Sequence, residues 1–260
     1  MSKLNKYSYR LKTISRLVLS PREHQGYYVA AGDFGEEIYK RNNIEQGVKI
    51  IYPFYQYGTY NGYHPEQTRY YIPGSSIKGA MLSYLNEQYS KKLMVDDVLV
   101  DYSHLGLHHL HKLQHASEET NKQATIKKFF PNIAVEMIQA DVELRGQLYA
   151  ETDPSDFLNE AQMASHEKLK QLHKGMVQVC SGDTAMNDDT RTKLEETVSH
   201  LETWIHTSGG NDSRTYLLLL GGYKGLMLSG IFDKEAANSA VYLDTDKLLP
   251  HGLVQVRLEE

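Results

Sequence analysis

The sequence predicts an α+β fold, because segments with strand-like and helix-like patterning follow one another along its 260 residues. Residues 7–19 alternate apolar and polar side chains, as a half-buried strand does. Residues 155–173 and 190–206 instead place apolar side chains at helical spacing. Residues 215–220 form a short apolar run that is typical of a fully buried strand.

Two further segments predict strands with a local irregularity. Residues 48–57 are rich in aromatic and β-branched side chains, and Pro53 indicates that this strand lies at an edge or is broken there. Residues 133–149 alternate over a long stretch, and Gly146 within them predicts a β-bulge. We expect both segments to belong to a sheet.

The order of these elements, with one further helix between residues 48–57 and 133–149, fits a ferredoxin-like βαββαβ core. In that arrangement residues 1–260 form a single domain, and a mainly helical insertion occupies about 151–210. Residues 174–190 are polar toward their end and are predicted to link the two helices of the insertion.

Composition excludes several classes of protein. The formal net charge of −5 excludes a globally basic nucleic-acid coat protein. No apolar run approaches the roughly 18 residues that a membrane span needs, and the N-terminus lacks the pattern of a signal peptide. The only cysteine, Cys180, can form neither an internal disulfide nor a multi-cysteine zinc site, and we expect it to be a small buried hydrophobic residue. We therefore expect a cytoplasmic protein with no membrane partner.

Charge is unevenly distributed along the chain. Residues 151–200 hold five basic and ten acidic side chains. Residues 1–30 hold one acidic side chain, Glu23, and six basic ones: Lys3, Lys6, Arg10, Lys12, Arg16 and Arg22. This asymmetry suggests a face that meets a polyanion, and chance clustering is the alternative.

The segment YIPGSSIKGA at residues 71–80 is the first candidate binding motif. Gly74 follows a proline in a predicted tight turn, and Ser75 or Ser76 then caps a helix whose first N–H groups and dipole favour an anion. Lys78 adds a positive charge that suits a phosphate. The spacing is not that of a Walker A loop, and an ordinary capped helix is the alternative.

Two loops provide further candidates. In residues 220–225, Gly221 and Gly222 allow a close backbone approach and Lys224 indicates an anionic ligand, although a plain β-turn is the alternative.

The other loop, residues 20–28, follows the first predicted strand. Arg22 and His24, with Gly26 and the tyrosine pair that begins at Tyr27, could hold a phosphate and stack a base. A surface histidine without a role is the alternative.

In their order, the three motifs resemble the RAMP superfamily of CRISPR effector subunits. The closest resemblance is to the fifth subunit of the Csm-type (type III-A) complex, and it covers residues 20–28, 70–85 and 216–232. Three features depart from that pattern: an apolar segment replaces an expected arginine after Ala80, His24 lies one residue further from the preceding proline, and the chain is short.

The resemblance implies an RRM-like RAMP core and a non-catalytic, crRNA-binding subunit of an antiviral ribonucleoprotein. Such a subunit caps the backbone at the crRNA 3′ end and supports crRNA maturation, without a cofactor or metal. Its partners are the crRNA, a neighbouring backbone RAMP subunit, a small helical subunit, host nucleases and, indirectly, target RNA. The residues implied to contact RNA are Arg22, His24, Gly26, Tyr27, Gly74, Ser75, Ser76, Lys78, Gly221, Gly222 and Lys224.

Two alternatives remain open at this point. One is a RAMP endoribonuclease that processes precursor crRNA, with His24 as general acid or base and Lys224 stabilising the transition state. The other is a different backbone RAMP of a type III complex.

Tyrosine is concentrated in one segment of the chain, and histidine in another. Ten of the 19 tyrosines lie between Tyr27 and Tyr71, where they either stack on RNA bases or pack at a sheet edge or interface. Four histidines are spaced four, three and four residues apart and would share one face of a helix: His104, His108, His111 and His115. We expect a solvated or RNA-facing helix there, with a zinc or nickel site as the alternative.

Overall fold

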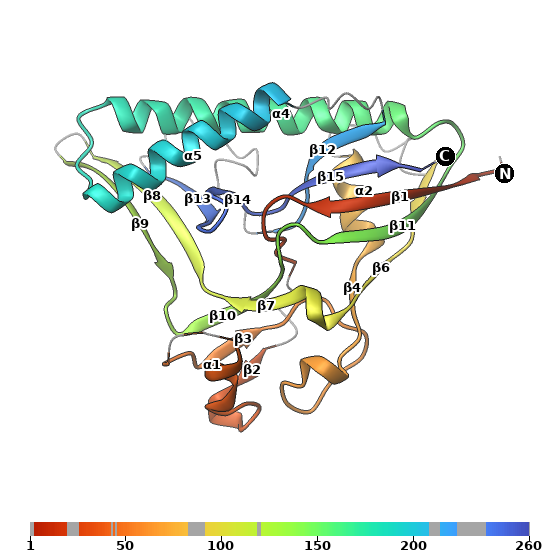
Figure 1. Ribbon diagram of the computed structural model, residues 1–260, viewed down its shortest axis with the longest axis horizontal. Coiled ribbons are helices and arrows are strands. Elements are labelled where there is room, and N and C mark those ends of the chain that lie inside the picture. Colours follow the sequence, from red (N-terminus) through yellow and green to blue (C-terminus); the bar gives the residue numbers. More distant parts are fainter. Residues whose placement is uncertain are drawn as a thin grey trace.

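The computed structural model describes residues 3–19, 26–42, 44, 46–82, 92–118, 121–207, 214–222 and 238–259. These residues form a mixed α+β fold, as predicted (Figure 1). Their strands assemble into one five-stranded, two four-stranded and one two-stranded sheet.

The five-stranded sheet has the order β12-β15-β1-β11-β5, and each strand is antiparallel to its neighbours. The predicted strands at 7–19 and 215–220 are confirmed as β1 and β12, although β1 ends at Thr13. The strand between them, β15, was not predicted. The bounds are β1 Asn5–Thr13, β5 Leu93–Val95, β11 Glu143–Ala150, β12 Thr215–Leu219 and β15 Leu253–Leu258.

Three helices cover this sheet. Helix α2 (Gly74–Leu82) and the first turns of α4 (Ser155–Ser181) pack on one face, together with core residues such as Tyr9. The rest of α4 and helix α5 (Asp188–Thr207) pack on the opposite face at its β12 end, against Leu217 and neighbouring apolar side chains. None of the helices in the described part of the chain is long and apolar enough to cross a membrane.

The predicted helices at 155–173 and 190–206 are confirmed, but the predicted linker at 174–190 is wrong. Helix α4 continues to Ser181 and α5 begins at Asp188. The helix continues because its apolar stripe does: Met176 is 1% exposed and packs in the core that α4 shares with α5. Cys180 lies in the last turn of α4 and is half-buried, not fully buried as expected.

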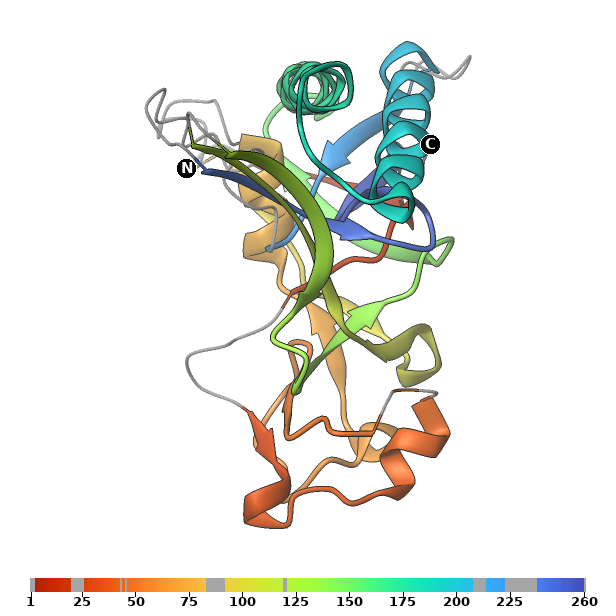
Figure 2. The ribbon, with the colours of Figure 1, turned by 90° about the vertical axis from the view of Figure 1, so that its left-hand side faces the viewer.

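A second sheet has the order β2-β3-β10-β7, with β3 and β10 parallel. Figure 2 shows the segment that holds β2, β3 and α1 at the end of the molecule opposite α4 and α5. The break expected at Pro53 is confirmed, because β3 ends one residue before it. The bounds are β2 Tyr27–Tyr28, β3 Ile50–Tyr52, β7 Leu105–His108, β10 Ile133–Ile138 and α1 Glu37–Asn42.

Two further sheets complete the described fold. One is a sheet of order β14-β13-β8-β9, and the other is the pair β4 and β6. Three short 3-10 helices connect elements at Val29–Ala31, Pro65–Gln67 and Tyr102–His104. The strand bounds are β4 Tyr70–Ile72, β6 Val98–Val100, β8 Leu110–Glu118, β9 Asn121–Phe129, β13 Asn238–Asp244 and β14 Leu249–Pro250.

The single strand predicted at 133–149 is two strands, and the bulge predicted at Gly146 is absent. Strands β10 and β11 are separated by a turn in which Asp141 has a φ of 63°. Gly146 stands in regular register opposite Tyr9. The reason for glycine here is space, since a Cβ at this position would lie 2.2 Å from the ring of Tyr9.

The helix predicted at the histidine-rich segment is also wrong. His108 ends β7, and His111 and His115 belong to β8. Strand β8 pairs along its length with β9 on one side and with β13 on the other. This backbone pairing overrides the helical spacing of the histidines, and no group of three metal-ligating side chains occurs among the described residues.

Candidate functional site

The first predicted motif opens helix α2, and its leading N–H group already has an anionic partner. The Gly74 N–H donates to Asp97 Oδ1 at 2.7 Å, while Asp97 Oδ2 accepts from the Tyr57 hydroxyl at 2.9 Å. A Cβ on Gly74 would lie 2.0 Å from the carbonyl oxygen of Val95, so only glycine fits between the helix and this loop. Burial and the hydrogen bond to Asp97 raise the pKa of Tyr57. The carboxylate of Asp97 therefore lies at the position that the sequence predicted for a phosphate.

The other predicted contact residues of this motif differ in exposure. Ser75 is exposed, and Ser76 and Lys78 are half-buried. The Ser76 N–H donates to the carbonyl of Pro73 at 2.9 Å, which closes the first turn within the chain. Among the predicted contact residues of this motif, Ser75 is thus the most exposed.

The two predicted loops begin close together. The Gly222 N–H donates to the Val18 carbonyl at 2.9 Å, and Gly221, with a φ of 91°, leaves no room for a Cβ beside that carbonyl. Val18 precedes the loop at residues 20–28, and Gly222 belongs to the loop at residues 220–225. Arg22, His24 and Lys224 lie outside the described residues.

The end of the first loop belongs to the hydrophobic core. Tyr27 is 6% exposed, its ring packs edge-on against Tyr63 at 5.5 Å between centroids, and its hydroxyl accepts from Gln56 at 3.0 Å. Gly26 lies against the ring of Tyr28, which is 45% exposed. Of this tyrosine pair, Tyr28 is therefore the one with a ring surface available for stacking.

The same core contains a buried carboxylate that the sequence reasoning missed. Glu136, 1% exposed, accepts hydrogen bonds from the Phe54 N–H and from the hydroxyls of Tyr63 and Tyr70, at 2.7–2.9 Å. Burial raises the pKa of Glu136, although these three donors oppose the shift. The detectable signal was an acidic residue inside the apolar strand that starts at Ile133. Several tyrosines of this region thus form the core around a carboxylate.

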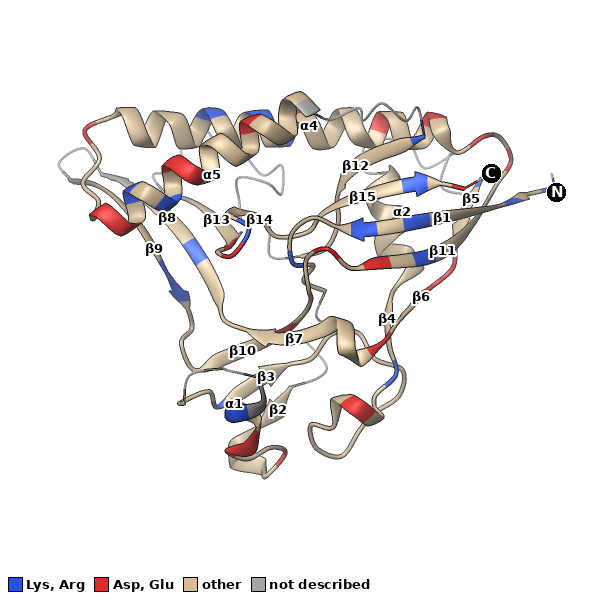
Figure 3. Cartoon of the chain, in the orientation of Figure 1, with Lys and Arg blue, Asp and Glu red and all other residues tan. Residues whose placement is uncertain are grey.

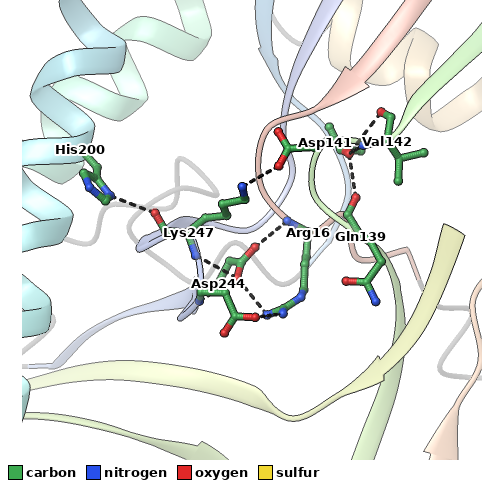
Figure 4. A network of polar contacts seen from close by, with 9 residues as sticks. Arg16, Gln139, Asp141, Val142, His200, Asp244 and Lys247 are labelled. Atoms are coloured by element: carbon green, nitrogen blue, oxygen red, sulfur yellow. Dashed lines mark hydrogen bonds and ion pairs between the residues drawn. The ribbon is translucent and has the colours of Figure 1, made fainter. Parts of the chain in front are cut away.

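A polar network holds the segment that follows β1 (Figure 4). Asp244, 1% exposed, accepts from the Arg16 N–H at 2.8 Å and from its guanidinium at 2.9 Å. Asp246 also pairs with Arg16. Lys247 pairs with Asp141 at 2.6 Å, and its carbonyl lies 3.0 Å from a ring nitrogen of His200 on α5. The network joins the β13–β14 turn, the β10–β11 turn and α5 to residues that lead into the first loop.

Two of the basic side chains behind the predicted charge asymmetry are paired with carboxylates in the structure. Arg16 is held by acidic partners, and Arg10 pairs with Glu143 and Glu259. Figure 3 shows basic segments side by side on β15, β1 and β11. The basic excess of the N-terminal region is therefore partly neutralised, and Lys6 and Lys12 lie on β1 of the central sheet.

Comparison with known proteins assigns no family. No protein-family model matches the chain, and no curated protein is found that matches it.

Proposed function

We propose that the chain is a non-catalytic, crRNA-binding subunit of a type III-A CRISPR ribonucleoprotein, which caps the backbone at the crRNA 3′ end and supports crRNA maturation. The observation that carries the proposal is the strand order β15-β1-β11-β5 within the central sheet. This order supports a ferredoxin-like core of the RAMP type.

The reasoning depends on how the four strands are connected. Helix α2 lies between β1 and β5 in the chain, and α4 with α5 lies between β11 and β15. β11 is inserted between β1 and β5 and is antiparallel to both. A strand inserted within a βαβ unit is the arrangement of the split βαβ, ferredoxin-like motif. On this proposal α5 and β12 are additions to the core.

Two of the three sequence motifs lie next to helices or strands of the central sheet. The segment at residues 71–80 opens α2, the first crossover helix, and Gly221 follows the added edge strand β12. Because Asp97 already binds the leading N–H of α2, we propose that Ser75, Ser76 and Lys78 meet RNA through their side chains. Arg22, His24 and Lys224, which lie outside the described residues, would contact the same RNA on this proposal.

The salt dependence of RNA binding tests the proposed phosphate contacts. Each lost contact to single-stranded RNA lowers the slope of log affinity against log salt by about 0.7. Lys78→Ala with Lys224→Ala should therefore lower it by about 1.4, whereas Lys174→Ala, a matched loss of an exposed charge on α4, should leave it unchanged. An unchanged slope in the double variant contradicts both assignments.

The stoichiometry of the assembled complex tests the capping role. Native mass spectrometry of the complex, purified with the products of neighbouring genes, should find one copy of this chain per particle. Several copies would indicate the alternative of a repeated backbone RAMP subunit.

The enzymatic alternative has its own experiment. The pure chain is incubated with repeat-containing RNA in the absence of metal ions. Intact RNA supports the non-catalytic role. Defined cleavage that disappears in His24→Ala would establish the endoribonuclease instead.

A further inference from the structure

Exposed apolar side chains gather where strand β5 passes into strand β6, and these strands follow one another down one side of the molecule (Figure 3). Leu99 of β6 is 61% exposed and Met94 of β5 is 58% exposed. Tyr57, in the segment that runs beside β4, is 37% exposed. Single exposed apolar residues are ordinary on a protein surface, whereas a group of them on one surface marks an interaction site.

Tyrosine rings join these three residues into one surface. The β4–β6 register places Tyr71 directly opposite Leu99. The Tyr57 ring stacks on the ring of Tyr71, with 4.0 Å between the ring centroids and 13° between the ring planes. At the other end, Met94 stands opposite Tyr149 of β11. These five residues form the surface that we call the β5–β6 face.

A pocket of about 430 Å³ adjoins this face. Leu99 forms part of its wall, and the bend between β5 and β6 contributes Asp96 and Asp97. The remaining lining comes from strands of the central sheet and from the residue that follows β15: Ser8, Arg145, Gly146, Gln147 and Glu259. The pocket thus combines an apolar wall with three carboxylates and one guanidinium.

The two aspartates at the bend have only neutral hydrogen-bond partners. Asp96 Oδ2 accepts from the Tyr149 hydroxyl at 3.2 Å, and Asp96 Oδ1 has no hydrogen-bond partner among the described residues. Asp97 accepts from the Gly74 N–H and from the Tyr57 hydroxyl. In the part of the chain that the structure describes, neither carboxylate forms an ion pair. Both negative charges at the bend therefore remain without a cationic partner there.

The cationic side chains around the pocket do not neutralise this bend. Arg10 pairs with Glu259 at 2.5 Å and lowers the pKa of that carboxyl, and the charge of Arg145 acts in the same direction. Arg69 lies over a tyrosine ring of the β5–β6 face, and Lys6 lies on β1 at its far end. Neither of these two cations lines the pocket, and within its lining the carboxylates outnumber the guanidinium by two.

We infer that the β5–β6 face is a protein interface, and that its pocket takes an arginine of the partner whose flanking apolar side chains pack on Leu99 and Met94. A guanidinium fits the pocket because it can bond a carboxylate through two parallel N–H groups and can also stack on an aromatic ring. Arg69, 5.7 Å from the centroid of the Tyr57 ring, already makes the second kind of contact on this face.

The composition of the surface favours a protein over RNA as its partner. Tyrosine, methionine and arginine are enriched at protein interfaces, where a few buried anchors provide most of the affinity. RNA phosphates would instead be repelled by the two carboxylates that lack a cation. The inference rests on the proposed function in one respect, namely that the chain works within an assembly, and it adds a surface outside the three sequence motifs.

Photocrosslinking from position 99 tests the interface. A photoreactive amino acid replaces Leu99 in the tagged full chain, and the complex is purified with the products of neighbouring genes and irradiated. Mass spectrometry should find a crosslinked protein segment that contains an arginine. Position 163 is the matched control, because Met163 is 68% exposed but lies on α4, and it should not crosslink to that segment. Crosslinks from position 99 to RNA, to a segment without arginine, or to no partner overturn the inference.

Charge reversal at Asp96 tests the pocket. Asp96→Arg should weaken binding of the crosslinked partner by at least about tenfold, and replacing the partner's arginine with glutamate should restore it. Asp183→Arg, a reversal at an exposed site between α4 and α5, should leave binding unchanged. If Asp96→Arg does not fold, Asp96→Asn keeps an oxygen for Tyr149 and should weaken binding in the same direction. Unchanged binding in the Asp96 variants, or no rescue by the exchanged charges, overturns the pocket assignment.

The same purified complex separates this inference from the proposed function. A complex that holds guide RNA but gives no protein crosslink from position 99 overturns the interface and leaves the proposed function in place. A complex that gives the arginine-containing crosslink but holds no guide RNA supports the interface and overturns the proposed function.

Discussion

Replacing Glu136 tests the buried carboxylate that organises the tyrosine-rich core. Its Oε1 accepts from the hydroxyls of Tyr63 and Tyr70, and its Oε2 accepts from the Phe54 N–H. Glu136→Leu leaves three buried donors without this partner, at roughly 1–3 kcal/mol per unsatisfied group. We expect a loss of at least about 3 kcal/mol in the free energy of unfolding. Glu136→Gln should cost less, because it keeps one acceptor oxygen for the hydroxyls.

The pH dependence of the same site distinguishes a buried charge from a simple packing role. Burial raises the pKa of Glu136 in the folded protein above its unfolded value, so the folded state binds the proton more tightly. The stability contributed by this proton is fully present below the unfolded pKa and is lost as the pH rises through the folded pKa. Wild-type stability should therefore fall relative to Glu136→Gln over that window.

Urea unfolding at a series of pH values measures this difference. Trp204 fluorescence and far-UV circular dichroism report the transition. Subtracting the Glu136→Gln curve cancels the titration of groups that both proteins share. A difference that is constant with pH, or that increases as pH rises, would refute the assigned pKa direction. A Glu136→Leu variant as stable as wild type would refute the hydrogen-bond account.

Four other positions yield predictions from the same structure. Asp244→Ala removes the buried carboxylate that holds Arg16 and leaves the exposed Asp246 as its remaining carboxylate partner in the network, so it should cost about 3–5 kcal/mol in urea unfolding, whereas an unchanged midpoint would show that the pair is not needed. Gly146→Ala places a methyl group against the ring of Tyr9 and should cost about 1–3 kcal/mol, a result that a neutral substitution would contradict. Asp97→Ala removes the anionic cap of α2 and should lower stability by about 1 kcal/mol while increasing phosphate binding at that helix start, and loss of phosphate affinity would argue against the cap. Burial lowers the pKa of His108 to about 4, so stability should decline by about 3 kcal/mol between pH 6.5 and 4, and His108→Asn should flatten that decline.

The elements that follow a simple period were predictable from the sequence. The strand at 215–220 is apolar after Thr215, and its apolar side chains are buried on both faces of the central sheet. The helices at 155–173 and 190–206 were predicted from apolar side chains at helical spacing, and these side chains pack in the hydrophobic cores on the two faces of the central sheet. In these segments local patterning and tertiary burial agree.

Other elements depend on pairing between distant segments. The histidine spacing at 104–115 matches a helix, but β8 gains its hydrogen bonds from β9 and β13, and no local pattern reveals those partners. Strand β15 was missed although Val254, Val256 and Leu258 alternate with polar residues, a period-two signal that was available.

The candidate site shows the same contrast between features with a local sequence signal and features that depend on pairing between distant segments. The sequence located the start of α2 and the glycine pair after β12, because glycine and capping residues leave local signals. It did not predict that Asp97 would reach the Gly74 N–H, since the two are brought together only by the β4–β6 pairing. The alignment of Arg257, Arg10 and Arg145 across the central sheet likewise exists only through the register of β15, β1 and β11.

The most direct test of the proposed role is to identify the RNA end that contacts this chain. The assembled complex is purified through a tag on the chain, crosslinked with ultraviolet light, and the RNA attached to this chain is sequenced. The account predicts guide RNA transcribed from a CRISPR array, with crosslinks confined to its 3′ end. Random cellular RNA, crosslinks spread along the whole guide, or no crosslinked RNA would contradict it.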